Sequence, residues 1–239
     1  ALIPLGLSWF GLATTKLAED AELLDLAARS GCSGVLMGFE SLSAASLRGS
    51  RKGFHRPDDF ASVVETLHRH AITLMACFAL GMDSDTPETV LQTAQMAVDL
   101  HIDLPRFSIV TPFPGTPLYT RLEAEGRILT RNWERYDAQH VVFQPSQMSP
   151  DELSRLHREA WRQTYSAGPM LRRPWRSRVR PAVSSATNLP YRAYASRAGS
   201  ATGASRAEIV ARSCPSGSRA RADAPASASP SAHGRWNRS

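Results

Sequence analysis

The sequence predicts an α/β protein built on a parallel sheet. Four apolar runs of 5 to 9 residues alternate with stretches of helical periodicity along the first two thirds of the chain. The runs are nearly continuous rather than alternating with polar residues, which is typical of strands buried on both faces of a sheet. Strand and helix alternate about every 30 to 40 residues, as successive β-α-β units do.

The expected elements follow one another in a regular order. Strands are expected at residues 2–10, 33–39, 72–80 and 106–110. Helices are expected at residues 17–29, 57–71, 85–100, 116–126 and 149–165. Gly31 is placed to end the first helix, and Pro57 to open the second.

Capping residues mark the starts of the later helices. Asp85 precedes Glu88 by three residues, and this is the spacing of a capping box. Ser149 has the same relation to Glu152, and Thr116 stands before a proline that fits a first helical turn. We expect the helix after Ser149 to pack on the outside of the sheet.

Charge divides the chain into two regions. Residues 176–239 contain eleven Arg, no Lys and two acidic residues, a net charge of +9, which leaves −3 for the rest of a chain whose total is +6. Such a basic segment, rich in Ala, Ser, Pro and Gly, buries too little apolar surface to offset its ordering entropy. We therefore expect a folded domain at residues 1–170 and a disordered low-complexity tail at 171–239.

Cysteine spacing and hydropathy narrow the class of protein. Cys32, Cys77 and Cys214 lie too far apart for a local metal or redox motif. No stretch reaches the roughly 20 apolar residues of a membrane span, and no signal peptide is evident. A cytoplasmic protein is expected.

Polar residues stand where the expected strands end, and parallel α/β proteins bind ligands at the carboxyl ends of their strands. Glu40 and Ser41 end the second run. Gly81 follows the third run and permits close approach of the backbone to a ligand. Asp83 and Asp85 form an Asp-x-Asp pair that could hold a divalent metal, whereas the structural alternative is that Asp85 only caps the next helix.

Other candidates have structural alternatives of equal or greater weight. His68 and His70 are two apart on a helix and point to different sides, which excludes joint metal ligation. His101 with Asp103 could bind a metal, but a solvated loop is the favoured interpretation. Trp9 could line a substrate cavity or pack in the core.

Four stretches, in this order, resemble the later part of a radical S-adenosylmethionine (SAM) enzyme of the subgroup that carries a cobalamin-binding domain. They are "GVLMGFESLSAASLRGSRKG", "ALGMDSDTPETV", "FSIVTPFPGTPLYTRLEAEGRI" and "NWERYDAQHVVFQPSQMSPDEL". The resemblance implies strands three to six of a six-stranded partial (β/α) barrel. It also implies an enzyme that uses SAM, a [4Fe–4S] cluster and, in this subgroup, cobalamin.

The resemblance assigns roles to particular positions. Glu40 with Ser41 matches the contact to the SAM ribose, and one carboxylate can accept from both ribose hydroxyls. Lys52 matches the residue that pairs with the methionine carboxylate. The segment from Phe78 to Gly81 matches the one along the adenine. Thr111 with Pro112 matches the backbone contact to that base.

One departure from the family pattern is expected to matter. The Cys-x3-Cys-x2-Cys triplet that holds the cluster is absent, as is the glycine-rich segment that contacts the methionine amine. Both precede Ala1 in the family order, so we expect a fragment that lacks the N-terminal part of its domain and is inactive alone. The complete enzyme would cleave SAM reductively to a 5′-deoxyadenosyl radical, and the substrate is not identified.

Two alternatives remain at this stage. A phosphate-binding (β/α) barrel enzyme could use Lys52 as a Schiff-base lysine or Asp83 and Asp85 as metal ligands, but eight strands need about 250 residues. A nucleic-acid-binding module could act through the basic tail. The body of the chain offers that module no basic face, so nucleic acid is not a favoured partner.

Overall fold

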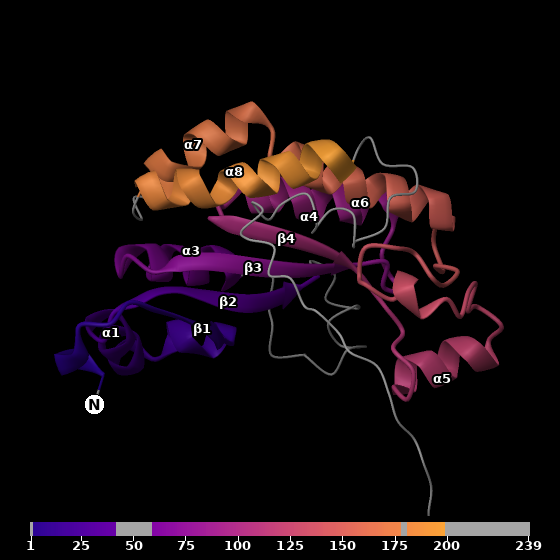
Figure 1. The fold of residues 1–239 in the computed structure, drawn as a ribbon, viewed down its shortest axis with the longest axis horizontal. Coiled ribbons are helices and arrows are strands. Elements are labelled where there is room, and N and C mark those ends of the chain that lie inside the picture. Colours follow the sequence, from indigo (N-terminus) through magenta and orange to yellow (C-terminus); the bar gives the residue numbers. More distant parts are fainter. Residues whose placement is uncertain (1, 42–58, 178–180, 199–239) are drawn as a thin grey trace, which may run out of the picture. The chain divides into compact units, whose positions relative to one another are not determined.

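The computed structural model describes residues 2–41, 59–177 and 181–198, which lie in one compact unit, Ala1–Ser200. Its centre is a four-stranded parallel sheet in the order β1-β2-β3-β4 (Figure 1). The strands are β1 (Trp9–Ala13), β2 (Cys32–Glu40), β3 (Thr73–Leu80) and β4 (Leu104–Ile109). The predicted parallel α/β architecture is confirmed. Residues 201–239 lie outside the described part of the chain.

Helices connect the strands and continue beyond the last one. They are α1 (Ala21–Arg29), α3 (Phe60–Arg69), α4 (Pro87–Asp99), α5 (Pro117–Ala124), α6 (Pro150–Thr164), α7 (Ala167–Ser177) and α8 (Pro181–Ala198). Short 3-10 turns are η1 (Ile3–Leu5), η2 (Thr15–Glu19) and η4 (Trp133–Arg135). The first apolar run is therefore only partly a strand, because its beginning forms η1. In the part of the chain that is described, no helix is long and apolar enough to cross a membrane.

The helix starts depend on side-chain caps, and one of them differs from the prediction. The hydroxyls of Thr116 and Ser149 accept from backbone amides in the first turns of α5 and α6, as predicted. For α4 the cap is Thr86 rather than Asp85, and its capping box is closed by Thr89 rather than Glu88. Asp85 is displaced from this role because its carboxylate binds the preceding loop.

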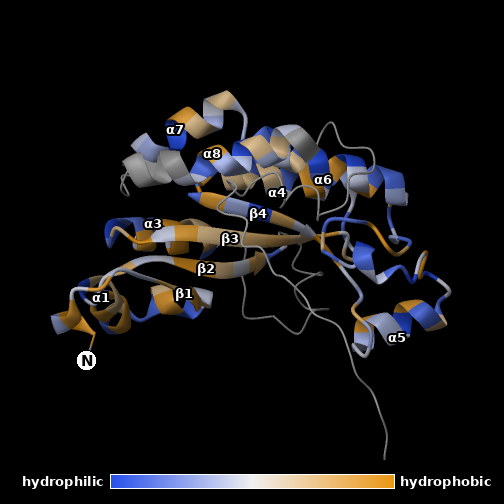
Figure 2. Cartoon of the chain, in the orientation of Figure 1, coloured by the Kyte–Doolittle hydropathy of each residue, from blue (hydrophilic) through white to orange (hydrophobic). Residues whose placement is uncertain are grey.

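The strands are buried on one face of the sheet, not on both as the continuous apolar runs indicated. Along β2 and β3 every second side chain lies in a core shared with α1, α3, α4 and α6, and the intervening positions are partly exposed. Strands β2 and β3 are nonetheless mainly hydrophobic (Figure 2). We call the partly exposed side the open face; its residues are Phe10, Leu12, Leu36, Gly38, Glu40, Met75, Cys77, Ala79, Arg106 and Ser108.

A row of aromatic rings crosses the covered face and fixes the strands against the helices. Phe60 of α3 stacks on Phe39 at 4.1 Å between ring centroids, and Phe39 meets Phe78 edge-on at 5.9 Å. Phe78 stacks on Phe107 at 5.5 Å, which in turn meets Trp161 of α6 at 5.9 Å. Such pairs contribute about 0.5–1.5 kcal/mol each beyond area burial.

Regular structure extends past the predicted boundary at residue 171. Helices α7 and α8 continue to Ala198, and α8 lies against α6, where Tyr191 and Tyr194 contact Trp161 at 6.1 and 4.8 Å between ring centroids. Asn188 of α8 is buried and donates to the carbonyl of Asp103. These contacts supply the burial that composition alone did not reveal. Residues 199–239 lie outside the described part, so disorder there stays a prediction.

Candidate functional site

The candidate site lies where β2, β3 and β4 end. Glu40 pairs with Phe78 of β3, and the amide of Val110 donates to the carbonyl of Leu80, which extends the pairing of β3 and β4 beyond the strands. Gly81 and Thr111 therefore follow neighbouring strand ends. Phe78, the partner of Glu40, precedes Gly81 by three residues. With strands about 4.8 Å apart and a rise of about 3.3 Å per residue, the α-carbons of Glu40 and Gly81 lie about 11 Å apart. The structure thus brings the predicted residues of three strands to one edge.

Glu40 adopts a backbone conformation that is rare for an L-residue. Its φ is +66°, and the pairing of β2 with β3 shifts register between Gly38 and Glu40. This turn folds the Glu40 side chain back over Gly38, so that a Cβ at position 38 would collide with the carboxylate. Ser41 is buried behind it, with its amide donating to Phe39 O at 2.9 Å. The sequence Gly-Phe-Glu-Ser therefore holds a carboxylate in place at the end of a strand.

The loop after β3 is organised by Asp85. Its Oδ2 accepts from the amides of both Gly81 and Met82 at 2.9 Å, and its side chain is only 3% exposed. Gly81 takes φ +95°, which a side chain would disfavour. The ring of Phe78 lies in the core, 1% exposed, so this residue reaches the site edge only through its backbone.

Thr111 and Pro112 form the turn after β4. The hydroxyl of Thr111 donates to Ile109 O at 3.0 Å, and Pro112 is buried. On the outer side of β4, the amide of Ile109 donates to Ala138 O at 2.8 Å. Lys52, the remaining predicted site residue, lies outside the described residues.

Asp83 is an ion-pair hub. Its carboxylate accepts from Arg121 at 2.7 Å, Arg127 at 2.8 Å and Ser146 at 2.7 Å. Partial burial acts to raise its pKa, but the hydrogen bonds from Arg127, Ser146 and Arg121 outweigh burial and lower the pKa to about 2. The described residues contain no group of three or more His, Cys, Asp or Glu side chains that could hold a metal ion. The carboxylates proposed for an Asp-x-Asp metal pair instead hold loops together.

Asp103 is buried instead of lying in a solvated loop. It is 0% exposed, and its Oδ2 lies 2.9 Å from Nε2 of His68 and accepts from the amide of Leu74 at 2.9 Å. It therefore links α3 to the start of β3. Trp9 also has a structural role, because its indole packs against the core and donates to Ser30 O at 3.0 Å.

Arg106 and Cys77 occupy the open face beside Glu40, and Arg106 was not among the site residues expected from the sequence. Gly38, Cys77 and Arg106 are register partners on three neighbouring strands. Burial raises the pKa of the Cys77 thiol, while Arg106 acts to lower it and Glu40 to raise it, so both charges lie near the sulfur. A charged residue at the start of the expected strand "RFSIV" was the available signal for Arg106.

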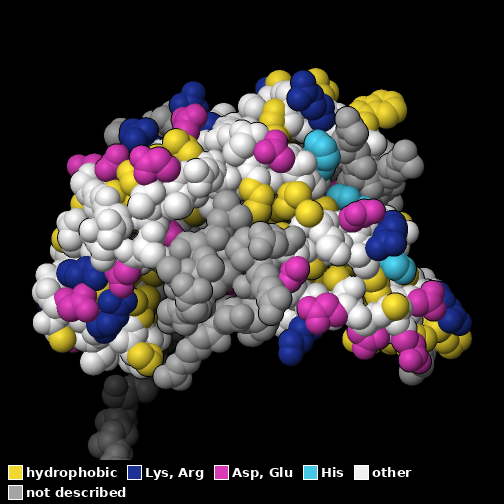
Figure 3. Space-filling model, turned by 180° about the vertical axis from the view of Figure 1, so that it is seen from behind, with side chains coloured by type: hydrophobic (Ala, Val, Ile, Leu, Met, Phe, Trp, Pro, Cys, Tyr) yellow, Lys and Arg dark blue, Asp and Glu magenta, His cyan; other side chains and the backbone are white. Residues whose placement is uncertain are grey.

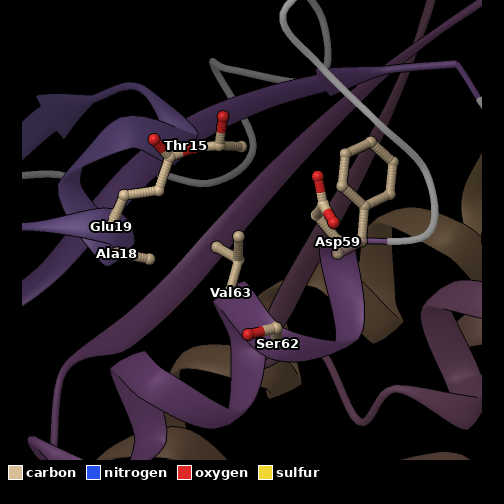
Figure 4. Close-up of a pocket in the computed structure, with 7 residues that line it drawn as sticks. Thr15, Ala18, Glu19, Asp59, Ser62 and Val63 are labelled. Atoms are coloured by element: carbon tan, nitrogen blue, oxygen red, sulfur yellow. The ribbon is translucent and has the colours of Figure 1, made fainter.

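A small pocket lies between η2 and the first turn of α3, close to the same edge. It has a volume of about 270 Å³ and is lined by Thr15, Ala18, Glu19, Asp59, Phe60, Ser62 and Val63. Glu19 and Asp59 lie on opposite sides of it (Figure 4). Both carboxylates are exposed to solvent.

Comparison with known proteins gives one family match and several relatives. A family described as a domain of unknown function (DUF4070) matches residues 116–193. Bacteriochlorophyllide d C-12(1)-methyltransferase of Chlorobaculum tepidum is 31% identical over 169 residues, which are 71% of this chain and 37% of that protein. Anaerobic magnesium-protoporphyrin IX monomethyl ester cyclase of Cereibacter sphaeroides is 26% identical over 162 residues, 68% of this chain and 26% of that protein.

Among the solved structures that are similar is the radical S-adenosylmethionine methyltransferase TsrM of Kitasatospora setae with cobalamin and a [4Fe–4S] cluster bound, at 26% identity and a TM-score of 0.46 over 63% of this chain and 30% of that one. The chain thus spans 37% and 26% of the lengths of the two curated relatives named. The resemblance found in the sequence is confirmed: this chain is a relative of the radical SAM enzymes of the cobalamin-binding subgroup.

Proposed function

We propose that this chain supplies the SAM-binding edge of a radical SAM enzyme, and that the whole enzyme methylates or rearranges an organic substrate with cobalamin as a further cofactor. One observation carries the proposal. Three neighbouring parallel strands end together and bring Glu40, the backbone at Gly81 and the turn at Thr111 to one edge. Ligands of open parallel sheets bind at such edges.

Glu40 has the properties that a ribose contact requires. Its carboxylate accepts hydrogen bonds only, so it can pair with two adjacent hydroxyls of a nucleoside. Gly38 leaves space beneath the carboxylate, and the left-handed backbone at Glu40 fixes its direction. Bound SAM would supply the methyl or adenosyl group. The residues of this chain would bind and orient it, with Ser41 and the Thr111 turn restricting the edge around it.

The described residues do not fit an iron–sulfur cluster. Cys32 is buried on β2 and donates to Gly34 O, and Cys77 lies on β3. A cluster needs several thiolates in one place, and the third cysteine, Cys214, lies outside the described part. We therefore assign no step to a cluster held by these residues.

The two alternatives are less well supported. In the barrel-enzyme alternative Asp83 and Asp85 would bind a metal, but both carboxylates are occupied by loop contacts. In the nucleic-acid alternative the body would present a basic face. On the face that Figure 3 shows, acidic and basic side chains are instead interspersed over the described residues.

Titration of the full chain with SAM tests the proposal. Isothermal calorimetry on the wild-type chain is expected to detect binding, and Glu40→Gln is expected to weaken it about 10-fold or more, because hydrogen bonds to a charged group contribute about 1.5–3 kcal/mol. Glu22→Gln, at an exposed position on α1, is the matched control and should bind like wild type. Equal affinities for wild type and Glu40→Gln, or no binding by the wild type, would contradict the proposal.

A further inference from the structure

Arg106 is a half-buried cation that makes no hydrogen bond or ion pair with another described residue. It lies on β4 with its side chain on the open face, beside Cys77 of β3. Within the described ranges its guanidinium makes no hydrogen bond or ion pair. Because a guanidinium carries five donors, leaving all of them unpaired at a partly buried position is costly.

Two other arginines that are largely buried have hydrogen-bond or ion-pair partners within the protein. Arg173, 1% exposed, donates to Asn188 and to Thr164 O, and it stacks on Tyr165. Arg127 pairs with Asp83 and Glu125 at 2.8 Å each. Arg106 has no comparable partner among the described residues, so an anionic ligand would give its guanidinium the hydrogen bonds that the other two arginines obtain from the protein.

The residues around Arg106 indicate which chemical groups the rest of such a ligand would carry. Toward the amino ends of the strands the open face is apolar, with Leu36 and Met75 half-buried and Leu12 84% exposed. Toward the carboxyl edge lies Glu40, whose carboxylate covers Gly38. Gly38 and Arg106 lie on strands that are two apart in the sheet, so their α-carbons are about 10 Å from each other. An occupant of this face would contact hydrocarbon side chains with its body and one cation with its edge.

We propose that Arg106 binds a carboxylate of a large, mainly apolar substrate that lies on the open face, and that this substrate is a tetrapyrrole acid. The inference rests on the proposed function, since it places the substrate on the side of the sheet that the Glu40 carboxylate faces. A guanidinium matches a carboxylate in charge and in its planar geometry. Two relatives are named for tetrapyrroles, bacteriochlorophyllide d and magnesium-protoporphyrin IX monomethyl ester.

Two probes that differ in one group test the assignment. Magnesium-protoporphyrin IX monomethyl ester has one free carboxylate, and the dimethyl ester has none. The fluorescence of each probe is titrated with the full chain. Wild type is expected to bind the monomethyl ester about 10- to 100-fold more tightly, the range of a hydrogen bond to a charged group.

Variants separate the role of Arg106 from general effects. Arg106→Met is expected to bind both esters equally, and Arg106→Lys to keep part of the preference because it keeps the charge. Arg69→Met, an exposed arginine on α3, is the matched control and should keep the whole preference. Circular dichroism of each variant verifies the fold.

The inference is overturned if wild type binds both esters equally or binds neither, or if Arg106→Met retains the preference. The SAM titration separates this failure from failure of the proposed function. Arg106→Met should bind SAM like wild type. If Glu40→Gln binds SAM like wild type while Arg106→Met loses the preference for the monomethyl ester, the function proposed for Glu40 is wrong and the carboxylate site at Arg106 is supported.

Discussion

Acidification is expected to destabilise the protein through His157, which joins α6 to the sheet. This side chain is 4% exposed, and its Nε2–H donates to Phe107 O at 3.0 Å, a carbonyl that also accepts from the Trp161 indole at 3.2 Å. Burial is the main cause that lowers the pKa of His157 to about 4, against an opposing effect of the bond to Phe107.

The direction of the effect follows from where the proton binds. In the unfolded chain the imidazole has its ordinary pKa of 6.5, so it takes up a proton well before the native protein does. The stability contributed by the neutral imidazole is complete above pH 6.5 and is lost as the pH falls from 6.5 toward 4. At pH 5 the loss amounts to about 2 kcal/mol.

Urea unfolding at pH 7 and pH 5 measures this loss. His157→Gln is the comparison variant, since its amide can still donate to Phe107 O but does not titrate. From pH 7 to pH 5 the free energy of unfolding of the wild type should fall by about 2 kcal/mol more than that of the variant. The other histidines titrate in both proteins, so their effect cancels in this comparison. Equal losses in the two proteins would refute the reasoning.

Two further predictions concern the strand ends and the cysteines. Gly81→Ala is expected to lower the free energy of unfolding by about 1–3 kcal/mol, because φ is +95° and the new Cβ would lie 2.5 Å from Leu153 Cδ2; unchanged urea unfolding would contradict this. Anaerobic reconstitution of this chain with iron and sulfide is expected to give no stoichiometric cluster and no 5′-deoxyadenosine. Cys32 and Cys77 lie on separate strands, so a stoichiometric iron content would show that the cysteines had been misread.

The sequence by itself determined the order and type of the main elements. Apolar runs gave β2, β3 and β4, and helical periodicity with caps at Thr116 and Ser149 gave α5 and α6. These features depend on neighbours within a few residues, which is why local patterns predict them. The positions of Glu40, Gly81 and Thr111 at one edge also followed, because parallel strands connected by helices must end on the same side.

Tertiary structure alone decided which groups meet across the fold. Asp103 is buried because it reaches His68, 35 residues away, and Asp83 is engaged by Arg127, 44 residues away. The ordering of α8 depends on contacts with Trp161. The open face arises because the described helices share one core on the other side, and this makes Arg106 a candidate ligand-binding residue. No local pattern encodes these outcomes, since each depends on which distant surface a side chain meets once the layers have assembled.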